Sequence, residues 1–289
     1  MPELPEVETI VRDLNRKVLN RAFLNVWSDE KRLVKKPGNF EEFKKKIKGK
    51  KILKIWRRAK NIIFNLSGGY ILLIHQKLTG HLLCGKWKMT NGKWQPLTKG
   101  PLEDPKNRFI HLVFWLDNND MIALCDLRKF AKVELLDKEE LKKELSSFGP
   151  EPLAENFTFE KFKEVLAGKK GKIKQILMNQ EIIAGIGNIY SDEVLWRAKV
   201  HPQKDVSELK ESELELIYQN IKKVLQQAIK LRGESISDFR DTSGEKGFFD
   251  TARKVYQREG EKCPRCGTII KRLKIGGRSA HFCPNCQKP

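Results

Sequence analysis

Four cysteines near the C-terminal end have the spacing of a metal site. Two residues separate Cys263 from Cys266, and after sixteen further residues Cys283 and Cys286 repeat that spacing. Paired thiolates at such intervals close a tetrahedral Zn²⁺ site, and four protein ligands leave no coordination position open for a substrate. The sequence therefore predicts one zinc ion with a structural role. Four unligated cysteines are the alternative.

The N-terminal stretch MPELPEVET holds a second group able to do chemistry. Once the initiator methionine is removed, Pro2 carries a secondary amine, and α-amines have a pKa of about 7.7–8.0 against about 10.4 for lysine. The adduct of such an amine with an aldehyde carbon is an iminium without an N–H to lose, so it remains an electron sink. This chemistry suits C1′ of deoxyribose, with Glu3 as acid or base. An inert chain end is the alternative.

The charge balance predicts a polyanionic partner. The 289 residues include 57 Lys and Arg against 37 Asp and Glu, a formal net charge of +20. Nucleic acid is the leading candidate. A membrane surface is a weaker candidate, because the chain has neither a run of about 18 apolar residues nor a basic and apolar leader. We expect a cytoplasmic protein in which Cys84 and Cys125 are small core residues.

The segment between the two cysteine pairs, IKRLKIGGRSAHF, has the pattern of a β-hairpin. Gly276 and Gly277 allow a tight turn, and Arg278 follows directly. Residues 260–289 carry a net charge of +6. A rigid, basic hairpin supported by zinc suits contact with DNA.

Hydrophobic periodicity divides the rest of the chain. A helical period over residues 5–18 is followed by short strands and turns over about 21–136, which favours a β-sandwich or a barrel. The helical period returns after the Pro- and Gly-containing stretch 146–153. Residues 232–250, rich in glycine and charge, are predicted to form a mobile loop. The predicted domains are 1–145 (helix plus β-sandwich), 153–252 (helical, with the loop) and 253–289 (zinc finger).

Three stretches together resemble one family. PELPEVET at the N-terminus, GIGNIYSDEVLW in the helical region and CPRCGTIIKRLKIGGRSAHFCPNC at the end are similar, in this order, to motifs of the formamidopyrimidine-DNA glycosylases. These are bacterial enzymes that excise oxidised purines from DNA and cut the strand. The resemblance covers nearly the whole chain. It implies a multidomain α+β fold with an N-terminal β-sandwich, a helix–two-turns–helix domain and a C-terminal zinc finger.

The resemblance also implies roles for single residues. Pro2 would form the Schiff base and Glu3 would act as its acid/base partner. Lys60, in RRAK, would contact phosphate and take part in proton transfer, and Arg278 would grip phosphates and assist the second elimination. Further DNA contacts are implied for Lys170, Lys174, Asn188 and His75, although a buried structural histidine remains an equal interpretation of the last.

Three more residues match those that fill the gap left when a damaged base leaves the stack. They are Leu78, in KLTG, and Arg128 and Phe130, in DLRKF. An apolar wedge lowers the cost of unstacking, and an arginine can hydrogen-bond the orphaned base. Two positions depart from the family pattern, because Leu78 replaces a methionine and Asn107 replaces a DNA-contacting histidine. By position Asn107 would still be a DNA-contacting residue, but the loss of the histidine leaves that contact open.

We therefore predict a bifunctional DNA glycosylase and lyase for oxidised purines in base excision repair. It would act as a monomer on damaged double-stranded DNA through a Schiff base and β,δ-elimination, without a membrane partner. The nearest alternative is the sister branch that excises oxidised pyrimidines. A non-catalytic DNA-binding zinc protein is the alternative from another class.

Overall fold

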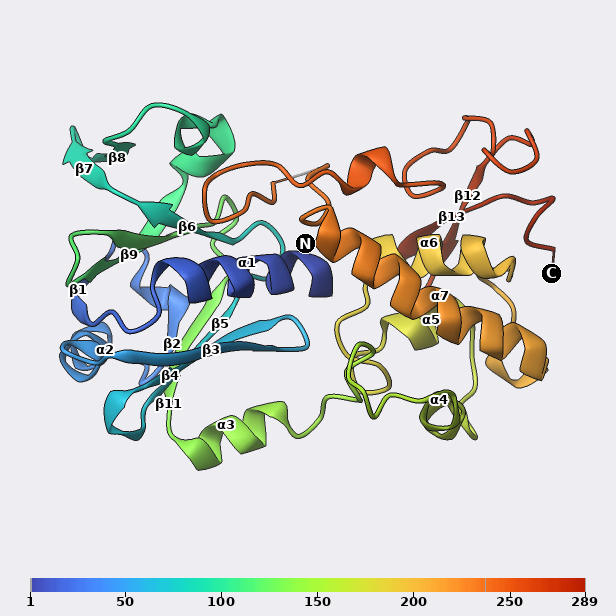
Figure 1. The fold of residues 1–289 in the computed structure, drawn as a ribbon, viewed down its shortest axis with the longest axis horizontal. Coiled ribbons are helices and arrows are strands. Elements are labelled where there is room, and N and C mark those ends of the chain that lie inside the picture. Colours follow the sequence, from blue (N-terminus) through green and yellow to red (C-terminus); the bar gives the residue numbers. More distant parts are fainter. Residues whose placement is uncertain (1, 237, 289) are drawn as a thin grey trace. The chain divides into compact units, whose positions relative to one another are not determined.

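The computed structural model describes residues 2–236 and 238–288. Their contacts divide the chain into two compact units. The first unit is Met1–Ser146 with Leu231–Asp250, and the second is Ser147–Lys230 with Thr251–Pro289. The ribbon in Figure 1 follows the elements of each unit along the chain. The domain boundaries expected from the sequence stay a prediction, but residues 231–250 make their contacts with the N-terminal unit.

Helix α1 (Leu4–Lys17) opens the first unit. Pro5 lies in its first turn, where a missing N–H costs nothing, and Glu6 favours the positive end of the helix dipole. The apolar residues recur on one face, so that Val7, Ile10 and Leu14 are fully buried. The helical period seen in the sequence is therefore confirmed.

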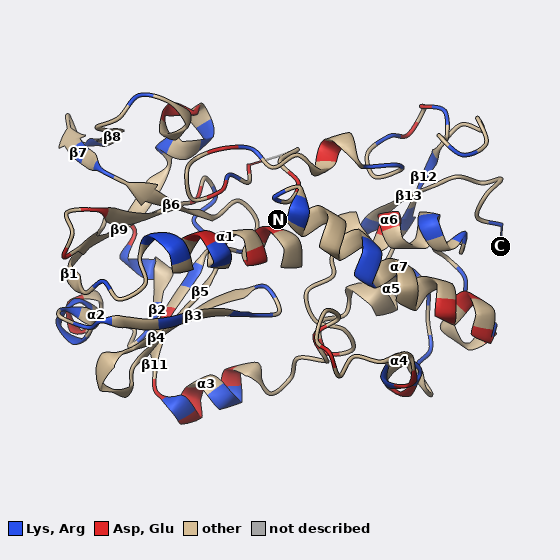
Figure 2. Ribbon diagram, viewed as in Figure 1, with Lys and Arg blue, Asp and Glu red and all other residues tan. Residues whose placement is uncertain are grey.

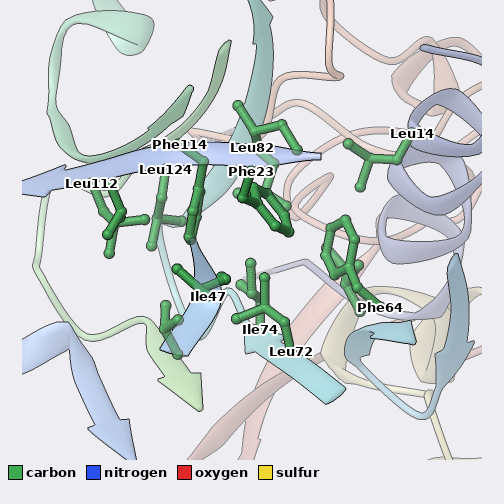
Figure 3. Packing of buried hydrophobic residues seen from close by; sticks show 14 of the residues in the cluster. Leu14, Phe23, Ile47, Phe64, Leu72, Ile74, Leu82, Leu112, Phe114 and Leu124 are labelled. Atoms are coloured by element: carbon green, nitrogen blue, oxygen red, sulfur yellow. The ribbon is translucent and has the colours of Figure 1, made fainter. Parts of the chain in front are cut away.

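Two sheets form the body of this unit, and the predicted β-sandwich is confirmed. The four-stranded sheet has the order β1-β9-β10-β6 and the five-stranded sheet the order β2-β11-β5-β4-β3. Their strands are β1 (Phe23–Ser28), β2 (Val34–Lys36), β3 (Ile52–Arg58), β4 (Asn61–Leu66), β5 (Ile71–His75), β6 (His81–Gly85), β9 (Ile110–Leu116), β10 (Met121–Cys125) and β11 (Lys132–Leu136). Side chains of both sheets and of α1 meet in one core, as Figure 3 shows for Phe114, Leu72 and Leu14.

Smaller elements complete the unit. They are α2 (Phe40–Ile47), α3 (Lys138–Leu145), the hairpin of β7 (Trp87–Thr90) and β8 (Lys93–Pro96), and 3-10 turns at Lys31–Leu33, Ser67–Gly69, Pro101–Glu103 and Pro105–Arg108. Cys125 is buried and Cys84 is half-buried against the main core. Burial raises the pKa of both thiols to about 12, as expected for core cysteines.

The described parts of the predicted mobile loop, 232–236 and 238–250, make specific contacts with the first unit, and residue 237 lies outside the described residues. The guanidinium of Arg232 pairs with both Asp13, on α1, and Asp241. Asp241 is buried, and its carboxylate also accepts hydrogen bonds from the backbone amides of Ser243 and Glu245. Glycine and charge in this segment therefore serve a network of ion pairs and turns, which composition alone does not reveal.

The second unit contains the helices and the cysteine module. Its elements are α4 (Phe159–Leu166), α5 (Ile173–Met178), α6 (Asn188–Ala198), α7 (Glu211–Lys230), β12 (Lys271–Ile275), β13 (Arg278–Phe282) and a 3-10 turn at Val206–Glu208, and a last 3-10 turn, Phe249–Thr251, lies where the units divide. Helix α7 buries a stripe that includes Ile217, Ile221 and Val224. Strands β12 and β13 pair antiparallel, so the predicted hairpin is present. Among the described residues, no helix is long and apolar enough to cross a membrane.

Candidate active site and nucleic-acid interface

The N-terminal end of α1 presents Pro2 and Glu3, both of which are buried. The Glu6 carboxylate fixes this end of the chain, because Oε2 accepts a hydrogen bond from the backbone amide of Glu3 at 2.7 Å. Its Oε1 accepts one from the amide of Glu234 at 2.8 Å. At Gly233 (φ +83°) a Cβ would lie 2.6 Å from Glu6 Oε1, so only glycine fits there. One buried carboxylate thus joins the predicted nucleophile to the segment 231–250.

The turn between β3 and β4 carries Lys60, which is buried. Arg57, just before this turn, pairs with Glu8 of α1 at 3.0 Å, so the turn lies toward the N-terminal end of that helix. Helix α1 packs against β3 and β4. The assignment of Lys60 to one site with Pro2 and Glu3 comes from the resemblance and stays a prediction.

His75 ends strand β5 and pairs in register with Asn61, the residue after Lys60. Burial, together with the positive charges of Lys77 and Lys60, lowers the pKa of His75 to about 3. Its Nδ1 accepts a hydrogen bond from the backbone amide of Lys77 at 2.9 Å. The neutral ring therefore carries its proton on Nε2, which is left as a donor.

Two neighbouring loops display the three residues of the predicted wedge. Leu78 is half-exposed, Arg128 is exposed, and Phe130 is 51% exposed. The guanidinium carbon of Arg128 lies 4.7 Å from the centre of the Phe130 ring, a cation–π contact. Leu127, in the same loop as Phe130, is 45% exposed, so the loop presents two large apolar side chains next to the cation of Arg128, a combination that suits a binding surface.

The loops are held together by Asp126, which is fully buried. Its carboxylate accepts hydrogen bonds from the backbone amides of Phe130 and Ala131 and from the hydroxyl of Thr79. Thr79 follows Leu78 directly, so one carboxylate connects both loops. Sequence reasoning missed this residue, although an acidic side chain between an apolar strand and an exposed loop was a visible signal.

Asn107 lies in the interior and not on a surface. It is 2% exposed, and its Oδ1 lies 2.9 Å from His81 Nε2. Its Nδ2 donates to the carbonyl oxygens of Pro101 at 2.8 Å and Gly244 at 3.2 Å. All polar atoms of the amide are therefore engaged within the first unit, which gives Asn107 a structural task and does not support a direct contact with DNA.

In the second unit a cavity of about 680 Å³ brings together Asn188 and Arg278. Asn188 is the first residue of α6 and follows Gly187, so backbone amides of a helix N-terminus point outward there. Arg278 begins β13 at the hairpin tip and is exposed. Arg272 and Ser279 add further donors to the wall. The carboxylate of Glu259 also lines the cavity and pairs with Arg272 at 3.4 Å, so Arg278 and the amides at the start of α6 are the groups that suit an anion such as phosphate.

Lys170 and Lys174 take different places in this unit. Lys170 is exposed in the turn before α5. Lys174 is 1% exposed, and its Nζ lies 2.5 Å from Asp192 Oδ1. The other oxygen of Asp192 accepts hydrogen bonds from the backbone amide and Nδ1 of His281, each at 2.9 Å. Lys174 therefore belongs to a buried network that joins α5, α6 and β13, while Lys170 remains available to a partner.

The four cysteines converge as the sequence predicted. Ligand atoms of Cys263, Cys266, Cys283 and Cys286 all lie within 4.8 Å of one another. Tetrahedral Zn²⁺ with bonds to sulfur of about 2.3 Å requires sulfur atoms about 3.8 Å apart, so this cluster fits zinc. The indole N–H of Trp196, on α6, donates to Cys263 Sγ at 3.4 Å, an outer contact that ties the metal site to the helical region.

Comparison with known sequences decides the family. The formamidopyrimidine-DNA glycosylase N-terminal domain matches residues 1–133, its H2TH domain matches 148–240, and the zinc finger found in FPG and IleRS matches 260–289. The chain belongs to the formamidopyrimidine-DNA glycosylase family. Similar relatives include the formamidopyrimidine-DNA glycosylases of Pelotomaculum thermopropionicum (38% identical, covering 100% of this chain and 99% of the relative) and Streptococcus mutans (37%, 100% of both).

Solved structures of this family have the same fold. A complex between the Lactococcus lactis Fpg and an abasic site containing DNA superimposes with a TM-score of 0.86 at 35% identity, covering 99% of this chain and 100% of that one. A structure of MutM in complex with carbocyclic 8-oxo-G containing DNA gives 0.86 at 36% identity and covers 100% of both chains. The expected order of β-sandwich, helix–two-turns–helix domain and zinc finger is confirmed.

Proposed function

We propose that this chain, a DNA glycosylase and lyase of the formamidopyrimidine family, removes oxidised purines by means of Pro2 and Glu3. The proposal rests on the buried Pro2–Glu3 pair that precedes α1 and is held by the carboxylate of Glu6. A fixed backbone at the nucleophile reduces the entropy lost when the amine reaches C1′ of the target sugar.

The proposed reaction begins with attack of the neutral Pro2 nitrogen on C1′. A bond from nitrogen to C1′ forms while the glycosidic bond breaks, and the base departs with the bonding electrons and takes up the proton that the attacking nitrogen loses. Glu3 donates a proton to the ring oxygen as the sugar opens, which leaves a cationic iminium on Pro2. The iminium acidifies the adjacent C2′–H, and loss of this proton expels the 3′ phosphate by β-elimination. Loss of the C4′ proton, now conjugated to the iminium, then expels the 5′ phosphate by δ-elimination.

We assign the remaining predicted residues to DNA binding, to neutralisation of phosphate charge and to proton transfer. We assign Lys60 and Arg278 to phosphate charge and proton transfer, and Asn188, Lys170 and the Nε2–H of His75 to phosphate contacts. Leu78, Arg128 and Phe130 fill the gap left by the everted nucleotide. Lys174 and Asn107, which are buried, support these groups from the interior.

One zinc ion bound by the four cysteines would stabilise the hairpin that carries Arg278. It would take no part in the reaction, because all four ligands come from the protein. We further propose that the protein works as a monomer in the cytoplasm, where it meets damaged double-stranded DNA.

Borohydride trapping tests the proposal. Untagged protein is mixed with a duplex carrying 8-oxoguanine opposite cytosine, and the reduced adduct is mapped by mass spectrometry. An adduct on Pro2 is expected, and Pro2→Gly should bind the duplex but lose most turnover. Glu3→Gln should lose turnover too, whereas Glu139→Gln, which changes an exposed carboxylate on α3, should keep it. Full activity of Pro2→Gly contradicts the mechanism. Activity on thymine glycol alone would favour the pyrimidine branch.

A further inference from the structure

Nearly half of the excess positive charge of the protein comes from one short segment. Residues 31–54 contain eleven Lys and Arg but only two acidic residues, a net +9 out of +20. They are Lys31, Arg32, Lys35, Lys36, Lys44, Lys45, Lys46, Lys48, Lys50, Lys51 and Lys54. We call this set the α2 basic surface, because it centres on helix α2 and the turn that follows it, as the blue segments of Figure 2 show.

Folding places these charges outward without neutralising most of them. Helix α2 buries Phe40, Phe43 and Ile47 against the core, so its lysines occupy the opposite face. Four of the eleven side chains form ion pairs with carboxylates, namely Lys31, Arg32, Lys36 and Lys46. Six others have no carboxylate within 4.0 Å among the described residues, namely Lys35, Lys44, Lys45, Lys48, Lys51 and Lys54. Like charges crowded in this way repel one another, and a polyanion relieves that repulsion.

The surface lies at the opposite end of α1 from the proposed nucleophile. Past the C-terminal end of α1, Asn20 donates its amide to the carbonyl of Ile52, and Ala22 pairs with Lys51. Pro2 precedes the other end of the helix, and fourteen residues of α-helix span about 20 Å. The part of the α2 basic surface that adjoins Ile52 and Ala22 is therefore separate from Pro2, whereas Arg32 lies near a wedge loop, because Glu30 pairs with both Arg32 and Lys129.

The chemistry of the surface favours one kind of polyanion. Its aromatic residues, Phe40 and Phe43, are buried, so no exposed ring is present to stack on unpaired bases. The apolar face of α2 is used by the core, so the helix has no face left to insert into a lipid headgroup layer. Flexible lysines fit a regular row of phosphates and read no sequence.

We propose that the α2 basic surface binds the phosphate backbone of duplex DNA outside the segment that holds the lesion. This second contact strengthens association with undamaged DNA and keeps the protein near the duplex while it searches. The inference rests on the proposed function only for the identity of the polyanion, and it requires no catalysis.

The test compares two variants with equal loss of charge. Lys44→Gln/Lys45→Gln/Lys48→Gln removes three charges from the α2 basic surface, and Lys138→Gln/Lys142→Gln/Lys143→Gln removes three exposed lysines from α3. Binding to an undamaged 40-base-pair duplex is measured by fluorescence anisotropy over a series of salt concentrations. Each lost phosphate contact lowers the magnitude of the slope of log Kobs against log[salt] by about 0.9. The α2 variant should therefore bind at least about tenfold more weakly, with a slope smaller in magnitude by about 2–3. The α3 variant should stay within about twofold of wild type.

Other results overturn the inference. Equal loss of DNA affinity in both variants would show that only the total charge of the protein matters. Unchanged affinity in both would show that the α2 basic surface is solvated and does not contact DNA. Because glutamine is a good helix former, α2 should stay folded in the triple variant. The variant Lys51→Gln/Lys54→Gln repeats the test outside the helix, since Lys51 precedes β3 and Lys54 lies on it. Single-turnover excision from a short duplex at saturating protein should be unchanged in all variants. Loss of excision in wild type itself would count against the proposed function and not against this surface.

Discussion

The buried carboxylate of Asp126 accepts a hydrogen bond from the backbone amide of Phe130 at 2.7 Å. Phe130 itself is exposed, so its position depends on how its backbone is held. The same carboxylate accepts from Ala131 at 2.8 Å and from the hydroxyl of Thr79, in the loop of Leu78. The backbone of both wedge loops is therefore held in place by one buried carboxylate.

Replacement of Asp126 by alanine should destabilise the first unit. Several donors would lose their acceptor in a buried place, and each unsatisfied group costs about 1–3 kcal/mol. We expect a loss of about 2–4 kcal/mol in the free energy of unfolding, measured by urea denaturation, together with slower excision from duplex DNA. Asp117→Ala, in an exposed turn, is the matched control and should change the free energy of unfolding by less than about 0.5 kcal/mol. Equal free energies of unfolding for the two variants would show that the Asp126 carboxylate does not stabilise the wedge loops.

Periodicity and spacing were sufficient to predict much of the fold. Short apolar runs bounded by turns predicted the strands of the sandwich, a 3.6-residue period predicted α1 and α7, and cysteine spacing predicted the metal cluster. These features depend on local sequence, since each element must bury one face or bring close ligands together.

The rest depends on contacts between distant segments. Lys174 and Asn107 are of residue types that usually lie at the surface, and the family resemblance assigned them to DNA contacts, yet each is buried among partners from elsewhere in its own unit. Glu6 and Asp126 resemble surface carboxylates for the same reason. Their roles appear only when the fold brings backbone amides to them, as with Glu234, which is 228 residues from Glu6.

The buried pair of Lys174 and Asp192 allows stability and DNA binding to be separated. Lys174→Met would leave the Asp192 carboxylate in the interior without its cation, and breaking a buried pair costs about 3–5 kcal/mol. We expect a loss of that order for the second unit in urea denaturation. Lys170→Met, in the exposed turn, should leave stability unchanged and weaken DNA binding. If Lys174→Met weakens binding while stability is kept, the lysine contacts DNA after all.

The cysteine cluster predicts a defined metal content. Purified protein should contain one zinc ion per chain by elemental analysis, and a strong chelator should release it with a loss of DNA affinity of at least about tenfold, because the hairpin of Arg278 is no longer held. Cys266→Ser removes one exposed ligand and should bind zinc poorly. Cys84→Ser should keep the full content, since that thiol packs against the sandwich core. Normal zinc content in Cys266→Ser would exclude that thiolate as a ligand.

His75 predicts how acid affects the first unit. Its pKa in the folded protein, about 3, lies below the ordinary value of 6.5, so the unfolded chain takes up this proton first as the pH falls. The free energy of unfolding is therefore unaffected by the titration of His75 above pH 6.5, and it falls as the pH falls from 6.5 toward 3, because the unfolded state binds the proton and the folded state does not. Between pH 7.5 and 5, wild type should lose up to about 2 kcal/mol more than His75→Gln, at about 1.4 kcal/mol per pH unit.

Two measurements check this expectation. Urea denaturation at several pH values gives the difference in slope, and the NMR signals of the His75 ring should show no titration between about pH 4.5 and 7.5. Lys77→Gln removes one of the positive neighbours that lower the pKa of His75, so its profile should fall between those of wild type and His75→Gln. A ring that titrates near pH 6.5 would instead be a cation in acid. It would then attract phosphate by charge, and not only through the Nε2–H that the contact with the Lys77 amide leaves as a donor.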